Sequence, residues 1–89
     1  MIKAITRSNF EFELNENVMD NMELVDLMAE IQSDGNPAAL AAAVKMMLGA
    51  DQQKALYNHV RTEDGRVPVA AIADAFTDIV KAMQESGKN

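Results

Sequence analysis

The stretch that decides the fold runs from Asn15 to Ile31 and reads NENVMDNMELVDLMAEI. Placed on a helix at about 100° per residue, its apolar residues gather on one side that extends well past a right angle. They are Val18, Met22, Leu24, Val25, Leu27, Met28, Ala29 and Ile31. A helix on a domain surface needs an apolar stripe of only ~100°, and this one is roughly twice as wide. We therefore expect a helix over 15–31 that lies at the centre of the domain or keeps part of its apolar face for a partner.

The remaining side of this helix is narrow and acidic. It carries Glu16, Asp20, Glu23 and Glu30. Leu27 interrupts this acidic strip. An apolar residue surrounded by charged residues is typical of a small interaction surface, because the charges keep the protein soluble when no partner is bound. Met19 and Met46 fall outside the core stripes of their helices, and methionine side chains suit adaptable binding surfaces. We expect Met19, Leu27 and Met46 to bind a partner. Leu24 is a fourth candidate, unless it is buried in the core.

The N-terminal residues predict a strand or a hairpin over 1–14. Phe10 to Leu14 reads FEFEL and alternates apolar with acidic residues, which is typical of a half-buried strand. Ile2 to Thr6 can pair with it through Arg7-Ser8-Asn9. Because an isolated two-stranded hairpin is unstable in water, its apolar side chains should pack on the helices.

Three further helices are expected after the first. Asn36 can cap the second helix and Pro37 suits its first position, while Gly49 should end it. Asp51 is expected to cap the third helix. The last helix carries an apolar stripe of about 120° between Val69 and Met83, which is the ordinary width for a helix that covers a core.

The predicted fold is therefore mainly α, with about four short helices packed around a central helix (15–31) and a short N-terminal strand or hairpin. We expect residues 1–89 to form a single small helical domain with a frayed tail at 85–89. Hydrophobic residues make up 48% of the chain, which excludes the composition of a disordered segment. The sequence contains neither a run of ~18 apolar residues nor a signal-peptide pattern, so a soluble cytoplasmic protein without membrane contact is expected.

Charge and residue usage exclude several classes of function. The formal net charge is −6, and the eight basic residues are scattered singly, so nucleic-acid binding is not expected. There is no cysteine, and His59 is the only histidine, which leaves no familiar zinc geometry and no catalytic signature. The turn Thr62–Val67 resembles half of a calcium loop but lacks carboxylates at the first and last ligand positions. We expect no catalytic, metal or cofactor-binding residues, and no enzyme.

Two runs of the sequence carry a likeness to a known family. FEFELNENVMDNMELVDLMAEI, followed by NPAALAAAVKMMLGADQQKALYNHVRTEDGRVPV, resembles the tail assembly chaperones of long-tailed phages and prophages of Gram-positive bacteria. The likeness covers roughly Phe10 to Val69 in order and spacing and contains no catalytic signature. The resemblance implies a small, acidic, mostly helical protein of the host cytoplasm.

The resemblance also implies partners. Such chaperones bind the tape measure protein during tail assembly, leave before or as tail tube subunits polymerise, and are absent from the finished virion. The tape measure protein is therefore the expected partner, with the tail tube protein as a second. Excess apolar surface, strong net charge and the lack of an active site suit a protein that holds a hydrophobic helical client.

A function of a different class stays open. The same surplus apolar face would suit a small acidic adaptor or regulatory protein, of a phage or a bacterium, that dimerises. Self-association into a homo-oligomer is therefore a second expectation from the width of the apolar arc.

Overall fold

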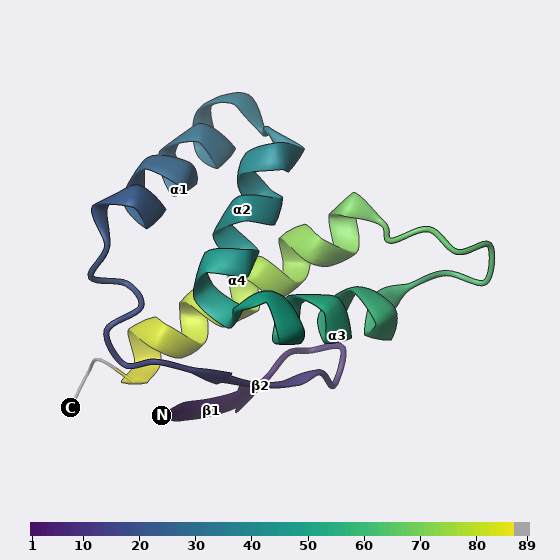
Figure 1. The fold of residues 1–89 in the computed structure, drawn as a ribbon, viewed down its shortest axis with the longest axis horizontal. Helices are drawn as coiled ribbons and strands as arrows, with labels where there is room; N and C mark the ends of the chain where they lie inside the picture. Colours follow the sequence, from purple (N-terminus) through teal and green to yellow (C-terminus); the bar gives the residue numbers. More distant parts are fainter. Residues whose placement is uncertain (87–89) are drawn as a thin grey trace.

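The computed structural model describes residues 1–86, which form a hairpin and four helices (Figure 1). The elements in chain order are β1 (Ile2–Ile5), β2 (Glu11–Leu14), α1 (Met22–Asp34), α2 (Pro37–Leu48), α3 (Ala50–Val60) and α4 (Val69–Ser86). The mainly helical class with an N-terminal antiparallel hairpin is confirmed. Glu85 belongs to α4, so the frayed tail does not begin there, and residues 87–89 of the predicted tail lie outside the described residues.

The centre of the fold is α2, and the prediction that 15–31 is central was wrong. Six residues of α2 are buried, whereas Leu24 is the single buried residue of α1. The buried α2 residues are Ala39, Leu40, Ala43, Val44, Met47 and Leu48. α2 contacts α1, α3, α4 and β2, while α1 packs chiefly against α2. An alanine-rich helix can take the central place because its short side chains let neighbours approach closely and pack densely.

The first helix also begins later than predicted, at Met22 instead of Asn15. The intervening residues form turns in which Asn15 Oδ1 accepts from the Asn17 amide at 2.9 Å and the Asn15 carbonyl accepts from Val18 at 3.1 Å. Asn21 is the N-cap, with Oδ1 accepting from the Glu23 amide at 3.0 Å. Asparagine side chains that bond nearby backbone groups compete with helical hydrogen bonds, which explains the late start.

The other helix ends lie close to their predicted places. Asn36 caps α2, Pro37 is its first residue and Gly49 follows its end. Asp51 was expected to cap α3, but it lies in the first turn, and Gly49 takes the cap position without a side-chain hydrogen bond. Glycine suits that place because its φ of +83° is a conformation that other residues rarely adopt.

The hairpin forms with the predicted turn. Its antiparallel register places Ala4 opposite Phe12 and Ile2 opposite Leu14. Phe12 and Leu14 are buried on the inner face, which covers the helices, and Glu11 and Glu13, which alternate with them, are exposed. Asn9 has a φ of +69°, as the last residue of a three-residue hairpin loop commonly does.

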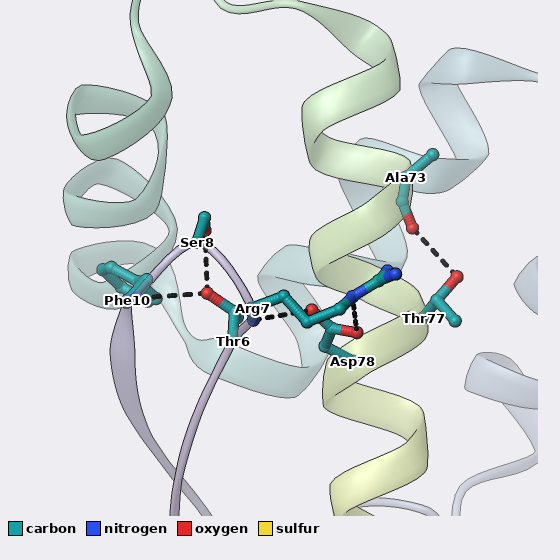
Figure 2. Close-up of polar contacts among 7 residues, drawn as sticks. All are labelled: Thr6, Arg7, Ser8, Phe10, Ala73, Thr77 and Asp78. Atoms are coloured by element: carbon teal, nitrogen blue, oxygen red, sulfur yellow. Dashed lines mark hydrogen bonds and ion pairs between the residues drawn. The ribbon is translucent and has the colours of Figure 1, made fainter.

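The hairpin tip is fastened to two helices. The Asp78 carboxylate on α4 accepts from the Arg7 amide at 3.0 Å and from Arg7 Nε at 2.8 Å (Figure 2). On the other side, His59 Nε2 on α3 lies 2.7 Å from the Ser8 carbonyl and bonds it. Figure 2 also shows Thr6, whose hydroxyl accepts from the Phe10 amide at 3.1 Å and closes the loop. The tip therefore holds α3 and α4 together at the hairpin.

The contacts of the Asp78 carboxylate favour its charged form. Its burial alone would raise its pKa, but hydrogen bonds from the Arg7 backbone and guanidinium, with the charges of Arg7 and Lys81, outweigh burial and hold the pKa below its ordinary value. A carboxylate with a lowered folded-state pKa stabilises the fold above its unfolded-state pKa, and this stabilisation is lost as the pH falls through the folded-state pKa.

Core truncations test the placement of the helices. Phe76 is buried on α4, so Phe76→Ala should lower the free energy of unfolding by about 3–5 kcal/mol. Val25 is 48% exposed on α1, so Val25→Ala should change it by less than about 0.5 kcal/mol. Urea denaturation of both variants measures this difference. A large loss from Val25→Ala would mean that α1 is buried after all.

A pH series tests the anchor of the hairpin. Asp78→Asn removes the carboxylate charge, so the variant should be less stable than the parent protein at neutral pH. The difference between their urea midpoints should shrink as the pH is lowered from about 6 through the ordinary carboxyl pKa of ~3.9 and below, because protonated Asp78 no longer holds Arg7 as an ion pair. Asp26→Asn, at an exposed position on α1, is the control. A difference that stays constant with pH would contradict this role.

Candidate functional site

An exposed apolar surface lies on α1. Met22 is 71% exposed and Val25 is 48% exposed, and Ala29 one turn further along is also exposed. Their spacing of three and four residues places the three side chains on one side of the helix. We refer to Met22, Val25 and Ala29 as the α1 strip.

The strip is exposed because α1 turns a different side toward α2. Leu24 is fully buried, and Leu27, Met28 and Ile31 pack partly against the core. Val25 follows Leu24 by one residue and so points about 100° away from the buried direction. In Figure 1, α1 lies at the outer corner of the molecule, with α2 as its neighbour. Nothing among residues 1–86 covers the strip.

Acidic residues border the strip along one side. Glu23, Asp26 and Glu30 of α1 are all exposed. The four ion pairs of the described residues involve other carboxylates, those of Glu13, Glu16, Asp64 and Asp78. The border therefore presents negative charge to solvent beside apolar side chains. A partner with an apolar face edged by lysine or arginine would be complementary to this surface.

The four residues expected to bind a partner are largely occupied by packing. Leu24 has an exposed fraction of 0%, so it has no surface to offer. Met19, Leu27 and Met46 are half-buried and pack against the core. Met46 also accepts a hydrogen bond from Asn21 Nδ2 at 3.5 Å, which ties the start of α1 to the end of α2. The structure thus places Met46 beside Asn21 at the beginning of α1, and Met19 shortly precedes that helix in the chain.

Sequence reasoning placed Met22 and Val25 on the inner side of the helix, whereas the structure exposes both. The signal that could have found them is Asn21, a residue type strongly preferred as an N-cap. With Asn21 as the cap, Met22 becomes the first helical residue, and a helix start is the place where a side chain is least surrounded by neighbouring turns.

The residues that could suggest chemistry make contacts within the fold. Residues 1–86 hold no cluster of three or more side chains suited to a metal ion. In the turn before α4, the Asp64 carboxylate bonds the Thr62 hydroxyl and Arg66 Nε, and these two contacts hold its pKa below the ordinary value. The exposed ring of His59 bonds the hairpin tip and lies against Phe10, with centroids 5.6 Å apart.

The sequence matches no family model, and neither the curated proteins nor the solved structures contain a match to it or to its fold. None of the helices in residues 1–86 combines the length and the apolar character that crossing a membrane requires.

Hydrogen exchange can test how α1 is held. Because α1 relies mainly on one neighbour, it should open locally more often than α2 or α4. We expect backbone amides in the middle of α1 to exchange at least about tenfold faster than those in the middle of α2, measured by NMR in the native protein. Equal protection of the two helices would show that α1 opens only when the whole domain unfolds.

Proposed function

We propose that the protein is a non-enzymatic tail assembly chaperone that binds an α-helical segment of a phage tape measure protein through the α1 strip. One observation carries this proposal: an exposed, acid-bordered apolar strip on a helix that packs mainly on one neighbour. Its support from the sequence is the resemblance over Phe10 to Val69. Under this proposal the protein acts in the host cytoplasm and is absent from the finished virion.

The geometry of the strip suits an amphipathic helix. Met22, Val25 and Ala29 follow the i, i+3 and i+7 pattern by which helices present anchors to one another. The strip spans about 10 Å at 1.5 Å per residue, so it covers only two turns of a client helix. A small interface of this kind binds transiently, which suits a chaperone that must leave before tube subunits polymerise.

Charge would guide the approach of the client. With a net charge of −6, and Glu23, Asp26 and Glu30 beside the strip, the protein attracts a segment that carries lysine or arginine beside its apolar residues. Such contacts at the rim mainly speed association and select orientation, while the desolvated apolar side chains provide most of the affinity. High salt should therefore slow the association of the client, but the client should still bind.

Substitutions in the strip test the proposal. Met22→Asp and Val25→Asp place a charge where a client helix would lie, and each should weaken binding by at least about tenfold, because a buried apolar side chain contributes about 1.5–3 kcal/mol. An aspartate at position 22 also suits a helix N-terminus, so the fold should be retained. The measurement is co-expression with the tape measure protein of the same genome, followed by pull-down and titration.

The matched control is Val69→Asp. Val69 is 57% exposed and lies at the start of α4, beside an apolar hollow of about 120 Å³ that Leu40 and Tyr57 also line. It tests the same chemical change at another exposed apolar position. Loss of binding from Val69→Asp with binding retained by Val25→Asp would move the client site to that hollow. If no folded variant and no parent protein captured a tape measure protein, the chaperone proposal would fail and an adaptor role would become the better explanation.

A further inference from the structure

The acidic border of the α1 strip continues along the whole helix as a regular row. Its members are Glu23, Asp26, Glu30 and Asp34, which are all exposed and follow one another at intervals of three, four and four residues. At about 100° per residue, this spacing keeps the four carboxylates on one side of α1. We refer to them as the acidic row. The row extends more than one turn beyond Ala29, the last residue of the α1 strip.

The acidic row lies on only one flank of the α1 strip. Each strip residue is followed directly by a carboxylate: Met22 by Glu23, Val25 by Asp26 and Ala29 by Glu30. The next residue of a helix is always rotated by about 100° in the same direction, so the three carboxylates fall on the same flank. The opposite flank carries the half-buried Met28 and the exposed Gln32, which are uncharged. The surface therefore differs between its two flanks, which a symmetric apolar patch does not.

Within residues 1–86, no ion pair balances the acidic row. α1 contains no lysine or arginine, and the four ion pairs of the described residues involve carboxylates outside this helix. Like charges three or four residues apart weaken a helix. In addition, Glu30 and Asp34 lie near the C-terminus of α1, which is the negative end of the helix dipole. A partner that brings positive charge to this flank would relieve both unfavourable interactions.

We propose that the α1 strip binds a helical segment that runs antiparallel to α1 and carries a lysine or arginine directly after each of its apolar anchors. This inference rests on the proposed function and specifies its client. The rule follows from helix geometry. When two antiparallel helices face each other, the flank that follows the anchors of one lies beside the flank that follows the anchors of the other. In a parallel client, the basic residues would have to precede the anchors instead.

The ends of α1 favour the antiparallel direction. An antiparallel client places its own N-terminus, the positive end of its dipole, beside Glu30 and Asp34. Its C-terminus, the negative end, then lies at the start of α1, which is the positive end of that helix. A parallel client would instead bring its negative end to Glu30 and Asp34. Charges at both helix ends therefore select the same direction.

A second copy of the chain does not complement this surface. It carries a net charge of −6. If its own α1 strip faced the first in the antiparallel direction, the rule given above would place the two acidic rows against each other. Like charges juxtaposed across an interface suppress binding. The occupant that complements the surface is therefore a basic amphipathic helix from another chain.

Two synthetic peptides test the direction. The first is an amphipathic helix in which a lysine directly follows each of several leucines spaced three and four residues apart. The second has the same sequence in reverse order, so that each lysine precedes its leucine while composition and charge are unchanged. The first peptide should bind the full chain about three- to tenfold more tightly, because only this peptide matches the acidic row and the helix dipoles in the same direction. NMR titration measures both affinities.

A spin label on the N-terminus of the first peptide reports its direction when bound. The label should broaden the amide signals of Asp34 and Gly35, at the end of α1, more than those of Met22 and Glu23. Stronger broadening at Met22 and Glu23 would overturn the antiparallel direction. Equal affinities of the two peptides would overturn it as well, because neither the acidic row nor the dipoles would then select an orientation.

Paired charge variants test whether the acidic row makes the contact. Asp26→Asn combined with Glu30→Gln should weaken binding of the first peptide by at least about threefold. The control combines Glu11→Gln with Glu63→Gln, which removes two exposed carboxylates outside α1 and should change the affinity by less than about twofold. Equal effects of the two pairs would mean that only net charge matters, which would overturn the inference.

The same experiments separate this inference from the proposed function. If neither peptide binds, but the tape measure protein is still captured and Val25→Asp still weakens that capture, the basic antiparallel client is wrong and the chaperone proposal stands. If capture of the tape measure protein fails too, both are wrong.

Discussion

The structure depends on the burial of α2, a helix whose alanines let three other helices and a strand approach it closely. Ala39 and Ala43 are buried together with Val44 and Met47, so neighbours pack on most sides of one short element. In a chain of this length the core is small, and a single well-surrounded helix is an economical way to exclude water from it. The consequence is unequal support elsewhere: α1 packs mainly on α2, whereas α4 contacts α2, α3 and β1.

Polar contacts hold the parts of the fold that apolar packing alone does not secure, chiefly the hairpin. Arg7 bonds Asp78 on α4, while Gln52 and His59 reach the hairpin from α3. A two-stranded hairpin is marginal in isolation, and here each of these contacts ties a different part of it to a helix. Gln52 of α3 serves the β2 edge, while Asp78 of α4 bonds the Arg7 amide just past the end of β1, so the two sides of the hairpin are held by different helices.

Features governed by nearby residues could be predicted from the sequence. The hairpin with its loop at Asn9 and the start of α2 at Asn36 and Pro37 follow from local turn and cap chemistry, and both are confirmed. The packing of α1 could not be predicted in the same way. A wide apolar arc does not indicate which of its residues contact another helix and which stay exposed. The arc contained both Leu24, which is buried, and Val25, which is exposed. For the same reason the expected partner-binding residues fell mostly on the packed side, and the exposed Met22 was missed.

The α1 strip is left free by the way in which the rest of the fold is held together. It lies on a helix that packs mainly on α2, whereas the hairpin is fastened to α3 and α4, so a partner bound to the strip would leave the contacts of the hairpin intact. Under the proposed function, a client of repeated helical segments would be bound by several copies of the protein. Any one copy could then leave quickly when tube subunits arrive, because each single contact is small.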